Sequence, residues 1–98
     1  MPALSEYSNV YNTCLLILKK KGWRYWYDEG LELFGAEKDG WDLLADSPAG
    51  LLGMVAIHEH RAPTEFREYW WREDDSIKLY RDIPRQKHEF TPVWQRKS

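Results

Sequence analysis

The sequence of 98 residues contains one cysteine and no long apolar run. A single thiol, Cys14, cannot form an intrachain disulfide or a cysteine-based metal cluster, which favours a reducing compartment. The longest apolar run, Leu51 to Ile57, is interrupted by Gly53 and is too short to cross a bilayer. The first residues also lack the basic start and apolar core of a signal peptide. We therefore expect a cytoplasmic protein with no membrane segment.

Sequence motifs for catalysis and cofactor binding are missing as well. There is no nucleophile elbow, P-loop or glycine-rich dinucleotide motif. The one histidine cluster, His58-Glu59-His60, falls on a predicted helix, where residues two apart point in different directions and are poorly placed to chelate one ion. Cys14 falls on the apolar stripe of another predicted helix, where packing is the expected role of a thiol. We expect no enzymatic activity, no cofactor and no metal.

A basic excess is also lacking, because the net charge is −2 and the sequence pI is near 5.9. Nucleic-acid-binding domains usually carry such an excess, so we do not expect nucleic acid as the main partner. The charge is uneven, however: residues 28–46 hold seven acids and one base, whereas residues 78–97 hold six bases and two acids. Either the acidic stretch faces a basic partner, or it is matched internally by the basic C-terminal segment.

Aromatic residues are abundant, with six Trp, six Tyr and three Phe. Rings of this size offset chain entropy when they are buried, which excludes disorder throughout the chain. A domain of this size buries only about 60–70% of the surface that its unfolded chain exposes. Some of the rings should therefore remain at the surface.

Hydrophobic spacing predicts the first half of the fold. Apolar residues three and four apart predict a helix over residues 5–21, capped by Ser5 and ended by Gly22. The spacing then changes to a period of two, which predicts three strands at 23–28, 31–37 and 41–45. Lys38-Asp39-Gly40 is a tight hairpin signal, so the strands should form an antiparallel meander.

The second half is predicted to contain another helix and another hairpin. Asp46-Ser47-Pro48 is a strong helix start, which predicts a helix over residues 48–60. Residues 65–73 and 77–82 then predict two more strands around a turn at Asp74-Asp75-Ser76. The remaining residues, 83–98, contain two prolines and many charges, which is typical of an extended or partly disordered tail.

We therefore expect an α+β fold with two layers, in which an antiparallel sheet of about five strands packs on two helices in the order α-β-β-β-α-β-β. Residues 1–82 would be a single domain. The order over residues 5–61 is similar to that of the double-stranded-RNA-binding domain and of the half-barrel of small antitoxin proteins. An RNA-binding domain of that type would present basic residues at the start of its second helix, where this chain has Asp46-Ser47-Pro48.

Alternate residues of a strand share a face, which divides the predicted strands into two sets. The almost wholly apolar set should face the helices: Trp23, Tyr25, Tyr27, Leu31, Leu33, Trp41, Leu43, Ala45, Tyr69, Trp71, Ile77 and Leu79. The other set mixes charges with rings and should form an outer face. Its candidate binding residues are Trp26, Phe34, Trp70 and Tyr80 with Arg24 and Arg72. Interface cores are enriched in Trp, Tyr and Arg, which makes this face the predicted binding surface.

The sequence thus predicts a non-enzymatic protein-interaction domain that binds a protein partner or a second copy of itself. An immunity-protein or antitoxin role would fit its size and acidity. Three alternatives stay open. The tail could cover the outer face with Phe90, Val93 and Trp94. Single-stranded nucleic acid could stack on Trp26, Trp70 and Tyr80, with Arg24, Arg72 and Lys78 contacting phosphates. A small-molecule pocket could lie between sheet and helices near Tyr7, Tyr11 and His58.

Overall fold

A computed structural model describes residues 2–74 and 76–95 of the chain. Residues 6–71 form one compact unit, here the globular unit, and the other described residues, 2–5, 72–74 and 76–95, form a second, here the tail unit. The two units are described separately. Asp75 of the predicted turn and residues 96–98 of the predicted tail lie outside the described residues. The predicted domain boundary after residue 82 stays a prediction.

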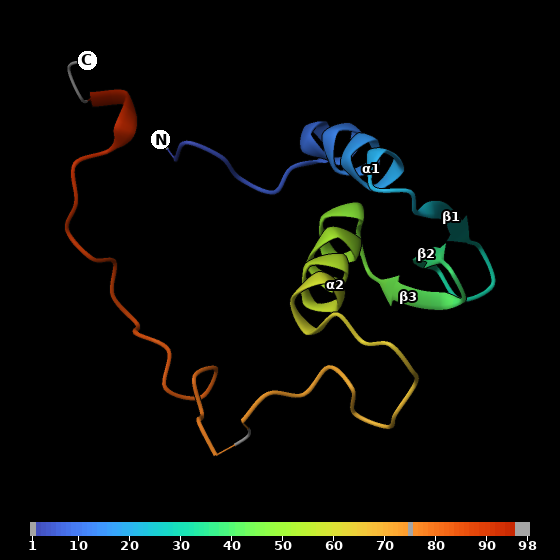
Figure 1. Cartoon of the computed structure of the whole chain (residues 1–98). Helices are drawn as coiled ribbons and strands as arrows, with labels where there is room; N and C mark the ends of the chain where they lie inside the picture. The colour runs from blue at the N-terminus through green and yellow to red at the C-terminus, as the bar shows by residue number, and fades with distance from the viewer. Residues whose placement is uncertain (1, 75, 96–98) are drawn as a thin grey trace. The chain divides into compact units, whose positions relative to one another are not determined.

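The globular unit contains two α-helices and three strands (Figure 1). In chain order, its elements are the 3-10 turn η1 (Ser8–Val10), α1 (Tyr11–Lys20), β1 (Arg24–Asp28), β2 (Leu33–Lys38), β3 (Trp41–Ala45) and α2 (Pro48–Arg61). The tail unit contains one short 3-10 turn, η2 (Val93–Gln95). The α+β class and the order α-β-β-β-α are confirmed. None of the described helices has the length and apolarity that crossing a membrane requires.

The expectation of about five strands is wrong for the described residues, whose one sheet has three strands. Residues 65–73 and 77–82 form turns and irregular backbone instead of a hairpin. The Trp70 N–H donates to the Arg67 carbonyl oxygen at 3.1 Å, and Tyr69 has a left-handed φ of 59°. Both features reverse the chain locally, which is incompatible with an extended strand over these residues.

Helix α1 ends as its sequence predicts but begins later. Ser5 does not cap it, because the helical backbone starts at η1, three residues further on. At the other end, the Gly22 N–H donates to the Lys19 carbonyl, and the Trp23 N–H donates to the Leu18 carbonyl, both at 3.0 Å. Gly22 has a φ of 90°, which glycine adopts without strain. This turn directs Trp23 into the core.

Helix α2 begins at the predicted cap. The Ser47 hydroxyl accepts a hydrogen bond from the Gly50 N–H at 3.0 Å, and Pro48 occupies the first helical position. The helix ends at Ala62, which has a left-handed φ of 46°, and Pro63 prevents its continuation. Both ends of α2 are therefore fixed by local sequence.

The sheet is antiparallel with strand order β1-β2-β3. Asp39 and Gly40 have φ angles of 51° and 86°, as in the two-residue hairpin turns that match strand twist. This turn pairs Lys38 with Trp41, and the same register places Tyr25, Ala36 and Leu43 in one row of the inner face. The next row, Trp26, Gly35 and Leu44, lies on the opposite, outer face.

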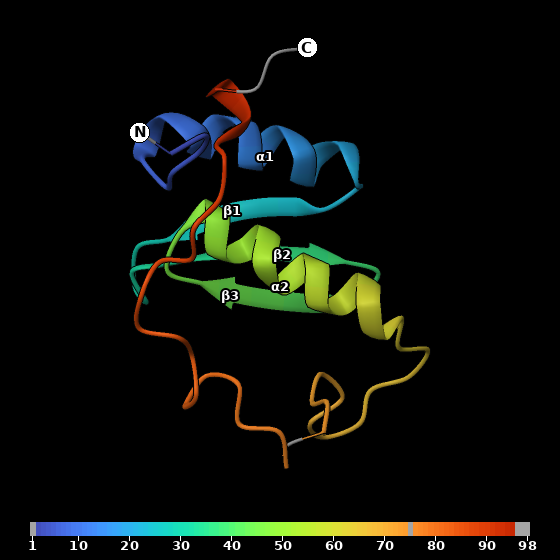
Figure 2. The same cartoon turned by 90° about the vertical axis from the view of Figure 1, so that its left-hand side faces the viewer.

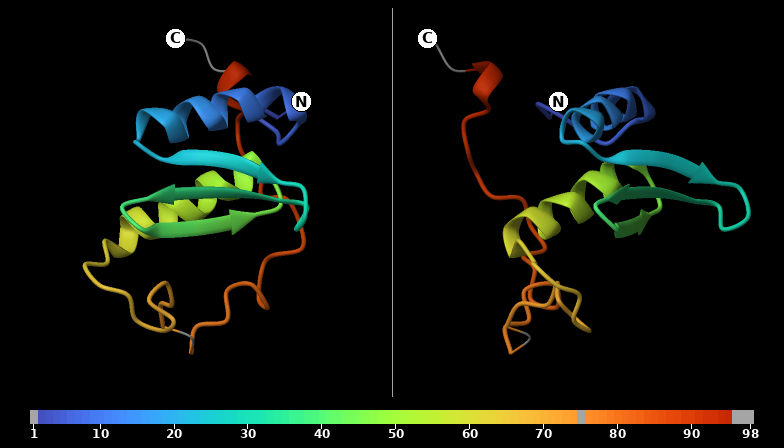
Figure 3. Two further views of the ribbon diagram at one scale, coloured as in Figure 1. Left: turned by 90° about the vertical axis from the view of Figure 1, so that its right-hand side faces the viewer. Right: turned by 45° about the vertical axis from the view of Figure 1, so that its right-hand side comes forward.

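The core lies between the inner face of the sheet and the helices. Helix α2 packs over β3 and β2, and α1 packs against α2 and β1 (Figure 2). The buried cluster consists of Leu18, Trp23, Ala36, Leu43, Leu51 and Val55. No helix of the globular unit covers the outer face, which is turned toward the viewer in the left panel of Figure 3.

The predicted faces of the second strand are wrong. Ala36 is fully buried and Phe34 packs against the core, so both point inward rather than outward. Leu31 lies in the turn before β2 and is 58% exposed, and Leu33 shares the outer face. Because side chains alternate with a period of two, assigning one residue of a strand to the wrong side inverts all of them. Phe34 is therefore not an outer-face residue.

Candidate functional site

The outer face carries one large ring, Trp26, which covers Gly35 of the neighbouring strand. An ideal Cβ at position 35 would lie 2.6 Å from two atoms of the Trp26 indole, so only glycine fits beneath the ring in its present position. Trp26 remains 41% exposed, and Leu44, on the other side of Gly35 in the same row, remains 46% exposed. The outer face thus carries an apolar row that ends at β3, the strand at one edge of the sheet.

The adjacent row of the outer face is charged. Arg24 Nε donates to Glu37 Oε1 at 2.9 Å, and the Gly40 N–H donates to Glu37 Oε2 at 2.9 Å. The Gly40 N–H and the Arg24 side chain hold the pKa of Glu37 below its usual range. Asp42 lies directly across from Glu37 on β3, so two carboxylates are neighbours in this row. Arg24 is already engaged by Glu37.

The four predicted binding residues that belong to the globular unit do not form one surface. Trp26 and Arg24 share the outer face, and Phe34 points inward. Trp70 lies in a turn and packs against the core from the side of α2. Arg72 and Tyr80 belong to the tail unit, where neither lies in a strand and Tyr80 is 93% exposed. Trp26 and Trp70 therefore do not supply a common stacking platform for bases.

Three indoles surround His58 on the inner side of the sheet. The His58 ring lies 5.3, 5.2 and 5.7 Å from the rings of Trp23, Trp41 and Trp70, with interplanar angles of 63° to 90°. Its Nε2 atom is buried and has no hydrogen-bond partner in the described part of the chain. Edge-to-face geometry of this kind lets an imidazole N–H approach an indole π face.

Trp70 is held in this cluster by backbone contacts. Arg61, in the last turn of α2, donates from Nε to the Trp70 carbonyl oxygen at 3.1 Å. The left-handed backbone of Tyr69 turns the chain immediately before it. Trp71 then follows beside Tyr69, with ring centroids 6.1 Å apart. This arrangement places two consecutive tryptophans next to β3.

A groove of about 490 Å³ lies between β3, α2 and these two tryptophans. We call it the β3 groove, and it is lined by Asp42, Leu43, Leu44, Met54, Ile57, Trp70 and Trp71. Leu44, Met54, Ile57 and Trp71 are 37–48% exposed. Apolar side chains that are scattered singly over a surface need no explanation, but several that converge on one groove indicate a binding surface. Of these groove residues, sequence reasoning singled out only Trp70 for binding.

The β3 groove borders an open strand edge. In a two-residue hairpin the flanking residues, Lys38 and Trp41, form a hydrogen-bonded pair, and such pairs alternate along an antiparallel ladder. Leu43 therefore bonds to β2, whereas the backbone N–H and C=O groups of Asp42 and Leu44 point away from it. Within residues 2–74 and 76–95, no strand pairs with this side of β3, and no loop hydrogen bond reaches it. Exposed strand edges are templates for pairing with another chain.

A second cavity, of about 450 Å³, lies beside His58 and opens near Lys38 and Glu59. Two of its polar side chains are engaged: Lys38 Nζ donates to the Lys21 carbonyl at 2.8 Å, and a Glu59 carboxylate oxygen lies 2.9 Å from Lys21 Nζ. The other two, Asp39 and His58, make no side-chain hydrogen bond within the described residues. Neither Tyr7 nor Tyr11 lines this cavity. Of the three residues suggested for a small-molecule pocket, only His58 lines this cavity, and the suggestion stays a prediction.

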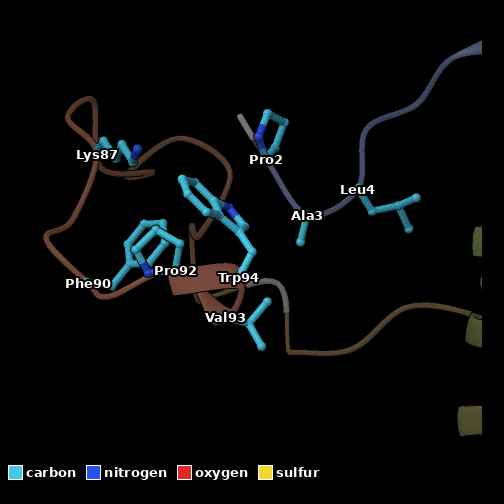
Figure 4. Close-up of a pocket in the computed structure, with 8 residues that line it drawn as sticks. All are labelled: Pro2, Ala3, Leu4, Lys87, Phe90, Pro92, Val93 and Trp94. Carbon is cyan, nitrogen blue, oxygen red and sulfur yellow. The ribbon is translucent and has the colours of Figure 1, made fainter. Parts of the chain in front are cut away.

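The tail unit contains an apolar pocket of about 500 Å³ (Figure 4). It is lined by residues 2–4 and by Lys87, Phe90, Pro92, Val93 and Trp94. Lys87 Nζ lies 5.1 Å from the centre of the Phe90 ring, within cation–π range. Among the described residues that line it, Lys87 alone carries a formal charge, so these residues offer no set of converging polar groups with which to orient a ligand.

Among the described residues, no three His, Cys, Asp or Glu side chains are placed to hold one metal ion. Comparison of the chain with protein-family models, with curated proteins and with solved structures finds no significant match.

Proposed function

We propose that the protein is a non-enzymatic protein-interaction domain that binds an extended segment of a partner along the open edge of β3. The observation that carries this proposal is the coincidence of the β3 groove with an unpaired strand edge. The edge supplies backbone hydrogen bonds, and the groove supplies apolar area for the side chains of the added strand.

The geometry fits such a strand. A residue placed opposite Leu43 would point to the inner side of the sheet, toward Met54 and Ile57 in the groove. A residue placed opposite Leu44 would point to the outer side and extend the apolar row that contains Trp26. Both faces of an added strand would therefore meet exposed apolar surface.

The test begins with random twelve-residue peptides displayed on phage and selected against the full chain. The affinity of each enriched peptide is then measured by fluorescence anisotropy for two variants, Asp42→Pro and Asp42→Asn. Both variants remove the carboxylate, but only proline removes the backbone N–H that points to the open edge. That N–H makes no bond to β2, so proline is tolerated at this position.

We expect Asp42→Pro to bind the enriched peptides about tenfold more weakly than Asp42→Asn, since one edge hydrogen bond and the approach of the added strand are lost. Circular dichroism and thermal melting establish that both variants are folded. Equal affinities of the two folded variants, or a selection that enriches no peptide, would contradict the proposal. Light scattering on the unliganded chain measures whether a second copy occupies the edge instead.

A further inference from the structure

We infer that the partner segment carries a lysine or arginine opposite Asp42 and apolar residues opposite Leu43 and Leu44. This inference rests on the proposed strand addition at β3 and specifies its partner chemistry. It follows from the charges that border the edge.

Three aspartates are spread along β3, one before the strand, one within it and one after it. Asp39 lies in the turn before the strand, Asp42 within it and Asp46 directly after it, and all three are exposed. In the part of the chain that the structure describes, they have no hydrogen bond or ion pair through their side chains. Glu37 and Glu59, by contrast, are paired with Arg24 and Lys21. Three unpaired carboxylates thus lie in β3 or directly beside it, while the exposed Glu29 and Glu32 lie at the other end of the sheet's first hairpin, in the β1–β2 turn.

The register of the sheet specifies which position of the added strand should be basic. Across the outer face, Arg24, Glu37 and Asp42 form one row with the charges plus, minus, minus. Like charges directly opposite each other on neighbouring strands are destabilising, and Arg24 reaches Glu37 from the far side. A basic residue opposite Asp42 on an added strand would give Asp42 a partner of opposite charge, as Arg24 already does for Glu37.

The neighbouring positions require apolar residues. The position opposite Leu44 continues the row of Trp26 and Gly35, and the position opposite Leu43 faces the β3 groove. A second copy of β3 does not meet these requirements: the pairing that avoids opposed carboxylates places Leu44 of the second copy opposite Asp42. The edge therefore favours a basic segment of another protein over self-pairing.

The inference is tested with the full chain and a blocked heptapeptide of sequence Thr-Thr-Val-Leu-Lys-Thr-Thr. In antiparallel register its valine, leucine and lysine lie opposite Leu44, Leu43 and Asp42. A glutamate version replaces the lysine, and a reversed sequence tests parallel addition. Affinities are measured by NMR titration for the wild type, Asp42→Asn, Asp42→Lys and a matched control, Glu29→Gln, which removes an exposed carboxylate in the β1–β2 turn.

We expect the lysine peptide, in one of its two directions, to bind the wild type about three- to tenfold more tightly than the glutamate peptide, with a smaller difference at high salt. Asp42→Asn should reduce the preference, Asp42→Lys should reverse it, and Glu29→Gln should leave it unchanged. N-methylation of the valine should abolish binding in the antiparallel register, whereas N-methylation of the leucine, whose N–H points away from β3, should be tolerated.

If the lysine and glutamate peptides bind equally well, the inference of a basic partner is wrong. If, in addition, N-methylation of the valine abolishes this binding and N-methylation of the leucine does not, the proposed strand addition is still supported. Absence of binding by either peptide would also overturn the inference. The proposed function itself would then depend on the phage-selected peptides and on the comparison of Asp42→Pro with Asp42→Asn.

Discussion

Replacing Gly35 by alanine should destabilise the protein only while Trp26 is present. The backbone of Gly35 is not left-handed, so alanine is compatible with its conformation. The added methyl group would nevertheless lie 2.6 Å from the indole, and the ring would have to leave the strand. The mutation thus tests how Trp26 packs on the outer face.

The change in the free energy of unfolding that we expect for Gly35→Ala is the difference between two opposing contributions. Trp26 is 41% exposed, so more than half of its surface is covered. A fully buried Trp removes about 150–250 Å² from water, so the covered part of Trp26 corresponds to roughly 90–150 Å². If about half to two thirds of this covered surface is lost, moving the ring would re-expose on the order of 60–80 Å². At about 25 cal/mol per Å² this costs about 1.5–2 kcal/mol. Replacing a strand glycine by alanine returns about 0.5–1 kcal/mol. The net loss in free energy of unfolding should be about 1 kcal/mol.

A double-mutant cycle isolates the contact. With Trp26→Ala as background, Gly35→Ala should stabilise the protein by about 0.5–1 kcal/mol, because no ring obstructs the methyl group. Urea denaturation followed by far-UV circular dichroism measures all four proteins without relying on Trp26 fluorescence. If Gly35→Ala has the same sign and size in both backgrounds, Trp26 does not cover Gly35 and the outer-face packing described above is wrong.

Substitutions at three other positions test further parts of the structure. His58→Ala should cost about 2 kcal/mol in urea denaturation because it leaves a cavity among three indoles, whereas His58→Phe should change stability by less than about 1 kcal/mol because it keeps a ring and removes an unpaired nitrogen. A large loss in both variants would contradict a mainly packing role. The folded-state pKa of Glu37 is lowered, so its contribution to stability is present above its unfolded-state pKa and is lost as the pH falls through the folded value. Glu37→Gln should therefore be less stable at neutral pH and less sensitive to acid, and unchanged acid sensitivity would refute this assignment. Asp42→Asn should have the same mass as the wild type in light scattering if Asp42 serves partner binding, whereas a larger mass would identify Asp42 as a residue that prevents edge pairing.

The sequence predicted the elements whose signals are local. Ser47 and Pro48 mark the start of α2, Gly22 marks the end of α1, and Asp39-Gly40 marks the hairpin. Each of these residues satisfies a backbone group or a backbone angle within a few positions of itself. Such constraints are present in the sequence whatever the rest of the chain does.

The face of β2 could have been predicted from the same hairpin. A two-residue loop pairs Lys38 with Trp41, and directly opposite residues share a face. Since Leu43 was expected to face the core, its partner Ala36 had to face the core as well. Alternation within β2 was judged instead from Leu31, which lies in a turn. Register from a neighbouring strand was the stronger signal.

The strands expected after α2 could not be judged from local pattern alone. Residues 77–82 alternate apolar and polar side chains, but a strand is stabilised by cross-strand neighbours, which short-range spacing does not identify. Likewise, nothing local indicated that Trp70 would pack against His58 and Trp41, because the left-handed backbone of Tyr69 turns it toward them. The β3 groove depends on this turn and so was not predictable from spacing.

The properties of β3 are consistent with the proposed partner binding and go beyond what protection of an edge requires. Proteins protect edge strands by keeping them short, by placing charges on them or by covering them. β3 has five residues and carries Asp42, which are protective features. Protection alone does not account for Leu44, Met54, Ile57 and Trp71, whose apolar side chains converge beside the same edge and would promote unspecific association. An edge that alternates acidic and apolar positions would disfavour a second acidic edge and would accept a strand that is basic and apolar at matching positions. Selectivity of this kind arises when repulsion and attraction are built into the same surface.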